Sequence, residues 1–231
     1  MSEQDTRQRY IVVDTETGGF DPVTCGLTEI AAVLVAYDGD WQAVEIEDRF
    51  CVLIRPVKGL AYHASALQVQ HRTLADLQRG MLEECAVLRF YVWLRSLAQI
   101  HGHIPIYAHC KELSARSMLF DVAFLMAAHE RLNLGAEAAE YVAFPVPIGW
   151  HSSVEMFKRL RKAGVHQCAS ASLDNVMLHY GITLPDERRH TALGDCEATA
   201  YAIAAMQRDL QGTEPGREQA VMAGLLGPGH E

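Results

Sequence analysis

The feature that most restricts the fold of this 231-residue chain is a change in its hydrophobic pattern after residue 54. Before that point, apolar and β-branched residues form three runs, at 10–13, 30–37 and 44–54. Such runs predict buried strands, and the Asp38-Gly39 pair between the second and third runs is a hairpin signal. Three sequential strands with short connections predict an antiparallel meander.

Beyond residue 80 the apolar residues recur at helical spacing. This spacing predicts helices at 82–97, 120–132, 152–163, 172–180 and 192–210. A fourth strand is expected at 104–108, between the first two of these helices. Strands that alternate with helices after a meander predict an α/β fold, in which helices flank a mixed sheet.

Composition excludes several classes of protein. The chain carries 20 basic and 29 acidic side chains, a net charge of −9, and 49% of its residues are hydrophobic. No apolar run approaches the roughly 18 residues of a membrane span, and the first residues lack the apolar stretch of a signal peptide. We therefore expect a cytoplasmic protein with no membrane partner. The negative charge argues against a protein that coats long duplexes, but not against one that grips a few nucleotides at a metal-filled site.

The cysteines of this chain form no C-x-x-C pair, which predicts reduced thiols rather than disulfides. They are Cys25, Cys51, Cys85, Cys110, Cys168 and Cys196. A second group, His101, His103, His109 and Cys110, matches no usual zinc spacing. We interpret its members as turn and strand-end residues, not as a structural zinc site.

Two carboxylates, Asp14 and Glu16, follow the first predicted strand in the segment VVDTETGG. Residues i and i+2 of a strand point to the same face, so these side chains project side by side. Like charges this close are costly unless a cation lies between them, and open α/β sheets bind ligands beyond the carboxyl ends of their strands. The pair therefore fits a metal site, while a solvated strand end is the alternative.

Three more candidate residues lie at the starts of helices. Asp121 stands in the first turn of the helix expected at 120–132, where the helix dipole favours an acid. Asp195 lies near the start of the last helix, and His190 precedes it by five residues on the entry segment. Taken singly, each has an ordinary interpretation, as a helix-capping acid or a surface histidine.

Together these residues occur in a definite order: D-x-E at a strand end, Phe-Asp on a middle helix and H-x-x-x-x-D on the last helix. In this order the chain resembles the histidine-containing subgroup of the DEDD superfamily of 3′-to-5′ exonucleases. The stretches that carry the resemblance are RYIVVDTETGGFDP, LTEIAAVLVAYDGD, FDVAFLMAAHERLNL and RHTALGDCEATA. Its ribonuclease T branch looks most similar, with the proofreading epsilon subunit of bacterial DNA polymerase III as a neighbour. The resemblance implies a ribonuclease H-like fold with a five-stranded mixed sheet.

The resemblance also implies a metal site. Two Mg²⁺ ions would be held by Asp14, Glu16, Asp121 and Asp195, with His190 as general base. Mn²⁺ is expected to be able to substitute for Mg²⁺. Hard oxygen ligands select such ions, and a pair of them about 3.5–4 Å apart serves phosphodiester hydrolysis. The implied reaction removes nucleoside 5′-monophosphates from the 3′ ends of single-stranded DNA or RNA. Because a histidine must be neutral to accept a proton, the rate should rise with pH as His190 deprotonates.

Substrate contacts are implied for Thr15, Thr17, Phe20 and Phe120. Enzymes of the ribonuclease T type stack terminal bases on aromatic side chains, and stacking is worth roughly 1–3 kcal/mol per base. Phe120 equally suits a place in the core at a helix start. Trp150 is a weaker candidate for a third stacking platform.

Several residues depart from the family pattern or flank it. Cys110 stands where the family has an Asn, and extra residues follow it in a loop at 110–119. His151 stands where the family often has an Asp. Arg188 and Arg189 either meet a phosphate or form a solvated charge pair. These departures bear on substrate preference more than on activity, because the main ligands are retained.

We expect an exonuclease domain at 1–211 and a mobile, glycine-rich tail at 212–231. Two alternative functions remain open. The first is a proofreading-type subunit that docks on a DNA polymerase through the tail and is weakly active alone; the second is a zinc-binding regulatory protein. The resemblance adds a possible homodimer. The sequence does not separate RNA from DNA, because recognition of the 2′-hydroxyl rests on a few contacts.

Overall fold

A five-stranded mixed sheet forms the centre of the computed structural model, which describes residues 7–113, 118–134 and 150–212. The strands are β1 (Gln8–Thr17), β2 (Leu27–Tyr37), β3 (Val44–Leu53), β4 (Ile106–Ala108) and β7 (Trp150–Ser152). Their order is β3-β2-β1-β4-β7. The pairs β1–β2 and β2–β3 are antiparallel, and β1–β4 and β4–β7 are parallel. The predicted α/β fold with an antiparallel meander followed by parallel strands is therefore confirmed.

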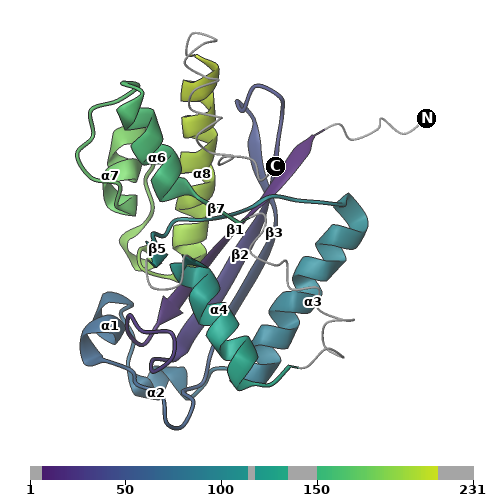
Figure 1. Cartoon of the computed structure of the whole chain (residues 1–231), viewed down its shortest axis with the longest axis vertical. Helices are drawn as coiled ribbons and strands as arrows, with labels where there is room; N and C mark the ends of the chain where they lie inside the picture. Colours follow the sequence, from purple (N-terminus) through teal and green to yellow (C-terminus); the bar gives the residue numbers. More distant parts are fainter. Residues whose placement is uncertain (1–6, 114–117, 135–149, 213–231) are drawn as a thin grey trace, which may run out of the picture.

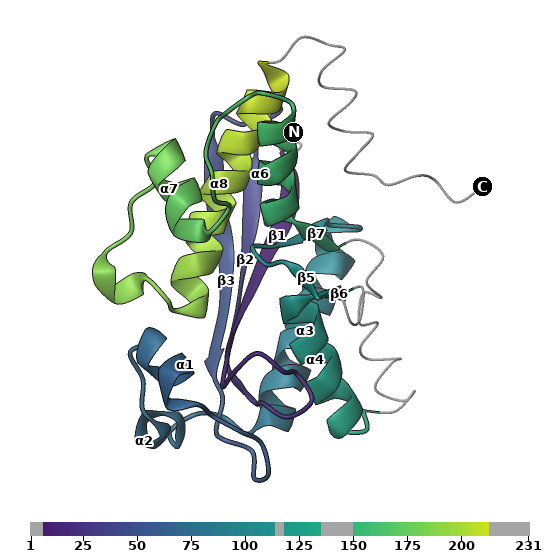
Figure 2. The ribbon, with the colours of Figure 1, turned by 60° about the vertical axis from the view of Figure 1, so that its left-hand side comes forward.

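Helices cover both faces of this sheet (Figures 1 and 2). One face carries α3 (Glu83–His101) and α4 (Phe120–Arg131). The other carries α6 (Ser153–Lys162), α7 (Leu173–Tyr180) and α8 (Ala192–Gln211). Each predicted helix is present, and α3 continues past its expected end at residue 97 to His101.

Periodicity did not predict the short elements. They are α1 (Ala64–Val69), α2 (Leu74–Leu77), the 3₁₀ turn η1 (Asp186–Arg188) and a two-stranded ribbon of β5 (Glu112–Leu113) and β6 (Met118–Leu119). Elements of so few residues show no measurable period. The β5–β6 ribbon pairs the two ends of the segment that the sequence suggested was an extra loop at 110–119.

The connection between β2 and β3 differs in detail from a tight Asp-Gly turn. Tyr37 pairs with Val44, so six residues (38–43) form the connection. The left-handed backbone conformation falls at Trp41, whose φ is 62°, and not at Gly39. The Trp41 ring stacks on Tyr37 at 3.6 Å between centroids, so packing of this ring accompanies the unusual conformation.

Alternation along β1 decides which layer each of its side chains enters. Ile11 and Val13 belong to the core beneath α3 and α4, whereas Tyr10 and Val12 belong to the core beneath α8. The Tyr10 hydroxyl donates a 2.8 Å hydrogen bond to the backbone carbonyl of Ala200 in α8. Since successive strand residues point to opposite faces, the same alternation directs the polar residues at the end of β1.

Three other expectations concern the whole chain. All six cysteines are free thiols, as predicted. No helix within the described ranges is long and apolar enough to span a bilayer. The last helix ends at Gln211, and the predicted mobile tail lies, apart from Gly212, outside the described residues. The division of the chain at 211/212 therefore stays a prediction.

Candidate active site

The end of β1 presents Asp14 and Glu16 toward the α8 side of the sheet and Thr15 toward the α4 side. Asp14 lies opposite Ala31 and Glu16 opposite Glu29 in the antiparallel pair with β2, and the register shifts directly after Glu16. Burial raises the pKa of Asp14 well above its ordinary value, and the neighbouring carboxylates raise it further. Burial likewise raises the pKa of Glu16, with added repulsion from other site carboxylates. These acids therefore lie close to one another in a poorly solvated place.

Asp121, in the first turn of α4, is 2% exposed. Its Oδ1 accepts two hydrogen bonds from Thr15, one from the backbone amide at 2.9 Å and one from the hydroxyl at 2.6 Å. Its Oδ2 is buried and has no hydrogen-bond partner among the residues that the structure describes. Burial raises the pKa of Asp121, although contacts with Cys110 and Thr15 oppose the rise. A buried carboxylate with one unpartnered oxygen suits a cation ligand.

Asp195 comes from the opposite face of the sheet, in the first turn of α8. Arg189 forms an ion pair with it and also bonds Asp174 at 2.5 Å. Burial raises the pKa of Asp195, while Arg189 and His190 lower it. Gly194 is required beside this acid, because a Cβ there would lie 1.9 Å from the Arg188 carbonyl oxygen. The helix start is thus closely packed against the segment that carries the candidate base.

The candidate base, His190, has a φ of 56°, a left-handed conformation that is uncommon for a residue with a side chain. Thr191 fixes the segment on its C-terminal side, since its hydroxyl caps α8 and donates to the Arg188 carbonyl at 2.9 Å. Arg188 pairs with Glu197 at 2.6 Å. Both arginines that flank His190 therefore bind acids of the protein, which matches the charge-pair interpretation rather than the phosphate-binding one.

The four carboxylates provide the donors that Mg²⁺ or Mn²⁺ prefers, and the free Asp121 oxygen gives such an ion a place to bind. Mutual repulsion also makes a cation favourable here. Nevertheless, no group of three or more His, Cys, Asp or Glu side chains in the described part of the chain is already arranged around a metal position. One reason is visible: Asp195 is turned to Arg189. The residues fit the ions, provided that this ion pair opens.

The predicted substrate-contacting residues lie in different surroundings. Phe20 is 88% exposed, on the loop after β1. Phe120 is partly buried, with its ring centroid 4.9 Å from that of Phe124. Thr15 and Thr17 are buried, and Thr17 donates to the Gly19 carbonyl at 2.7 Å. Phe20 is thus the most accessible of the four side chains.

Trp150 is not the exposed platform that the sequence suggested as a weaker candidate, whereas His109 lies at a strand end, as expected. Trp150 is 9% exposed and belongs to the core, so it is not an exposed platform. His109 forms hydrogen bonds of 2.8 Å to the Ser153 hydroxyl and 3.1 Å to the Ala171 carbonyl. Burial lowers its pKa to about 4, so His109 is neutral at pH 7. It fixes the 169–172 segment to the end of β4.

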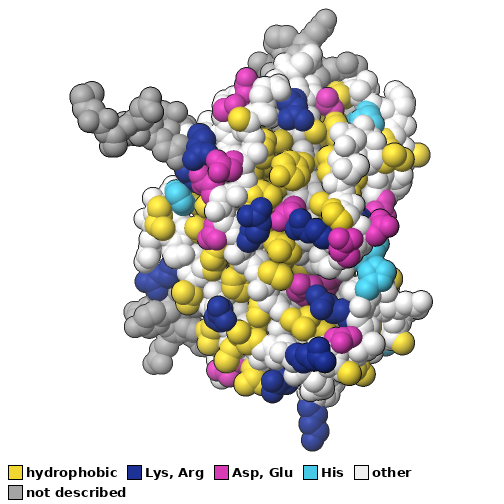
Figure 3. All heavy atoms as spheres, turned by 180° about the vertical axis from the view of Figure 1, so that it is seen from behind, with side chains coloured by type: hydrophobic (Ala, Val, Ile, Leu, Met, Phe, Trp, Pro, Cys, Tyr) yellow, Lys and Arg dark blue, Asp and Glu magenta, His cyan; other side chains and the backbone are white. Residues whose placement is uncertain are grey.

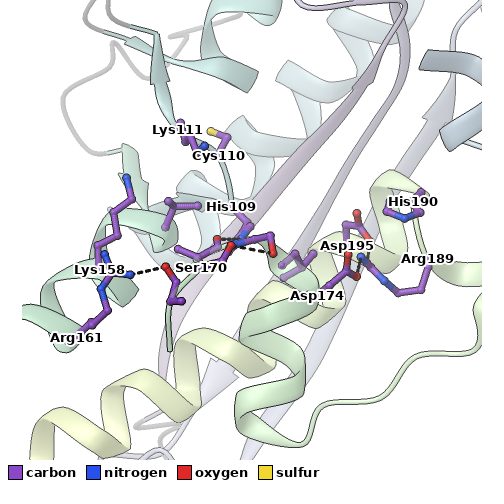
Figure 4. Close-up of a pocket in the computed structure, with 15 residues that line it drawn as sticks. His109, Cys110, Lys111, Lys158, Arg161, Ser170, Asp174, Arg189, His190 and Asp195 are labelled. Carbon is purple, nitrogen blue, oxygen red and sulfur yellow. Dashed lines mark hydrogen bonds and ion pairs between the residues drawn. The ribbon is translucent and has the colours of Figure 1, made fainter. Parts of the chain in front are cut away.

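A cavity of about 580 Å³ adjoins these residues (Figure 4). Asp195, His190 and Arg189 line one side of it, and Lys158 and Arg161 of α6 line the other. Sequence reasoning named Arg189 as a phosphate contact or a charge pair, but it did not identify the contribution of α6. The only available signal was the placement of basic residues on one face of the 152–163 helix, which is common on solvated surfaces.

Comparison with known proteins agrees with this geometry. The sequence model of a family described as "Exonuclease" (RNase_T) matches residues 11–203. Ribonuclease T of Histophilus somni is 24% identical over 203 residues, which are 87% of this chain and 84% of the relative. The solved nuclease domain of 3′hExo, a DEDDh family member bound to rAMP, has a TM-score of 0.64 at 16% identity and covers 89% of this chain and 94% of that one.

A second solved structure, the cell-death related nuclease CRN-4, has a TM-score of 0.62 at 15% identity. The match covers 87% of this chain and 64% of that nuclease, so this chain spans slightly less than two thirds of its length. At such identities the solved structures show a shared fold. The family match shows more, because it spans most of the chain, and the candidate carboxylates and His190 lie within its range of 11–203.

Proposed function

Because this chain belongs to the exonuclease family whose model spans residues 11–203, we propose that it hydrolyses phosphodiesters one nucleotide at a time from the 3′ ends of single-stranded DNA or RNA, releasing nucleoside 5′-monophosphates. One observation carries the proposal. Carboxylates from β1, α4 and α8 converge closely enough to raise one another's pKa, and one of them keeps a buried oxygen without a partner.

Asp14, Glu16, Asp121 and Asp195 would hold two Mg²⁺ ions, with Mn²⁺ as a substitute. When bound, such ions activate water and stabilise the charge on the leaving oxygen. Thr15 supports this arrangement because its two hydrogen bonds fix Asp121, so the free oxygen keeps one direction. The divalent-metal requirement is general in the DEDD exonucleases; the identity of the ions in this chain is part of the proposal.

His190 would accept the proton of the attacking water. Its position supports this role: His190, on the segment that enters α8, is close enough to Asp195 to lower the pKa of that candidate metal ligand. Phe20 is exposed enough to stack on the terminal base, which would hold the 3′ end without selecting a particular base. Arg189 would release Asp195 when the site fills.

A side-by-side assay tests the proposal. Equal-length labelled DNA and RNA oligonucleotides, each with a free or a blocked 3′ end, are incubated with Mg²⁺. We expect shortening only of the free 3′ ends, mononucleotide products and no reaction in EDTA. Internal cleavage, shortening from the 5′ end or full activity in EDTA would each contradict the proposal.

No described residue favours the alternative of a polymerase-docked subunit, since the tail that would dock lies, apart from Gly212, outside the described ranges. A homodimer and a cytoplasmic location likewise stay predictions. The DNA and RNA arms of the assay decide the sugar preference.

A further inference from the structure

The cavity beside Asp195 and His190 has an unusual charge for this protein. Its lining includes the cations Lys111, Lys158, Arg161 and Arg189, against the carboxylates Asp174 and Asp195. Arg189 bonds both of those acids, and Lys158 also pairs with Glu155, which does not line the cavity, so a ligand meets Lys111, Arg161 and the paired Lys158. The whole chain, by contrast, carries a net charge of −9. On the face seen from behind, basic and acidic side chains are mixed (Figure 3).

The wall of this cavity is held in place from two sides. Arg161 of α6 donates hydrogen bonds to the carbonyls of Ala169, at 2.6 Å, and Cys168, at 3.2 Å. His109, at the end of β4, bonds the Ala171 carbonyl at 3.1 Å. The segment between α6 and α7 is therefore fixed before any ligand binds, and a preformed site loses less entropy when it is filled.

We propose that this cavity binds the backbone phosphates of the nucleotides upstream of the 3′-terminal one, with Lys111 and Lys158 as the charged contacts. The inference rests on the proposed function, because the cavity opens from the residues that would hold the scissile bond. Neither Phe20 nor Phe120 lines it, so it does not coincide with the expected position of the terminal base. It therefore gives the rest of the strand a path along α6 (Figure 4).

Shape and chemistry favour a nucleic acid strand over an acidic peptide. The volume of about 580 Å³ lies within the roughly 300–1,000 Å³ of sites that enclose small ligands, and so suits a nucleotide unit. Ser170 and Ser172 add hydroxyl groups to the lining, which bond phosphate and sugar oxygens. A groove lined by lysines that tracks the backbone is the general way in which proteins hold single strands without sequence preference.

Binding to a labelled single-stranded oligonucleotide in Ca²⁺ tests the inference apart from hydrolysis. The test variant is Lys111→Ala/Lys158→Ala, and the matched control is Lys162→Ala, an exposed lysine of α6 that does not line the cavity. The side chains of the Lys158–Glu155 pair are 37% and 40% exposed, and pairs this accessible contribute little, so its loss should not affect folding. We expect the double variant to bind the oligonucleotide about tenfold more weakly. The slope of log K against log salt should also be smaller by about 1.4, because each of the two lost phosphate contacts contributes about 0.7.

Hydrolysis of substrates of different length provides the second measurement. The double variant should lose far more kcat/KM on a long oligonucleotide than on a dinucleotide, and circular dichroism checks its fold. Unchanged binding and salt slope, an equal loss in Lys162→Ala, or tighter binding of a poly-glutamate peptide than of the oligonucleotide would overturn the inference. Failure of the wild type to shorten any 3′ end contradicts the proposed function instead, whereas lysine-dependent binding would still support the groove.

Discussion

Asp121 and Asp195 are the two candidate ligands that helices supply, and they approach the end of β1 from opposite faces of the sheet. Asp121 on α4 is 2% exposed and is held by the uncharged donors of Thr15, with one oxygen free. Asp195 on α8 has a 14% exposed side chain and is neutralised by Arg189. Asp121 can receive a cation directly, whereas Asp195 must first exchange one cation for another.

The two residues illustrate two ways in which a folded protein stabilises a carboxylate that is a candidate metal ligand. On the α4 side, hydrogen-bond dipoles stabilise the Asp121 carboxylate and burial opposes them, while the charge of Asp121 raises the pKa of Asp14. On the α8 side, the protein supplies a full opposite charge. Removing the acid should therefore relieve repulsion at Asp121 but break an attraction at Asp195.

The largest expected effect is on activity, and the effect on stability should differ in size between the two acids. Asp121→Asn and Asp195→Asn should each lower hydrolysis on the order of 10³-fold or more, because each removes a metal ligand. In EDTA, both substitutions remove a charge that burial disfavours, so Asp121→Asn should raise Tm by a few degrees and Asp195→Asn by less, because it also breaks the Arg189 ion pair. About 1 kcal/mol moves Tm by roughly 2–4 °C in a protein of this size. Thermal unfolding without metal is the measurement. Equal Tm shifts in the two variants would contradict the proposed difference between the Asp121 and Asp195 carboxylates.

The next largest effect concerns the proton acceptor. His190→Ala should lower kcat by roughly 10²–10⁴-fold at neutral pH, the usual contribution of general acid–base catalysis. The wild-type rate should rise with pH, and most of that rise should vanish in the variant. Measuring kcat against pH from about 5 to 8 for both the wild type and the variant, at saturating metal, checks this. If the variant kept the wild-type profile, the proton acceptor would have to be another group.

Metal should stabilise the protein more as pH rises. Burial and repulsion raise the pKa of the site carboxyls in the folded state, so the metal-free folded protein binds more protons than the unfolded chain. Its stability therefore falls as pH rises from the unfolded value, about 4, through the raised folded values. Bound cations offset this cost, so the Tm gain from Mn²⁺ should be several degrees at about pH 8 and smaller at about pH 5. A gain independent of pH would contradict the assignment of these acids as ligands.

The smallest effect should come from Arg189. Arg189→Gln removes the cation that competes for Asp195, so the Kd for Mn²⁺ should fall by about threefold to tenfold, where tenfold corresponds to about 1.4 kcal/mol. Calorimetric titration of Mn²⁺ is the measurement. Arg188→Gln is the matched control, because Arg188 pairs with Glu197 and not with a candidate ligand. Equal changes in both variants would show that charge in general, and not this ion pair, sets the affinity.

Much of the fold could be predicted because it depends on local periodicity. The runs at 10–13, 30–37 and 44–54 alternate or stay apolar over several residues, and each became a strand. Strand β7 could not be found this way, because its sequence Trp150–Ser152 has no apolar run of the kind that marks β4, and it is defined by pairing with β4. Trp150 shows the same limit: an aromatic residue suits a platform or a core equally, and only the packing around it decides.

The sequence alone supplied the candidate ligands, because the spacing of Asp14 and Glu16 on a strand is a local property and the order of the motifs that contain Asp121 and Asp195 resembles that of a known family. Only the tertiary structure decided their partners: Thr15 for Asp121 and Arg189 for Asp195. Partner choice depends on which side chains two layers bring within hydrogen-bond distance. These partners lie in different layers or segments, and the spacing of residues in the sequence does not predict which side chains come within hydrogen-bond distance of one another.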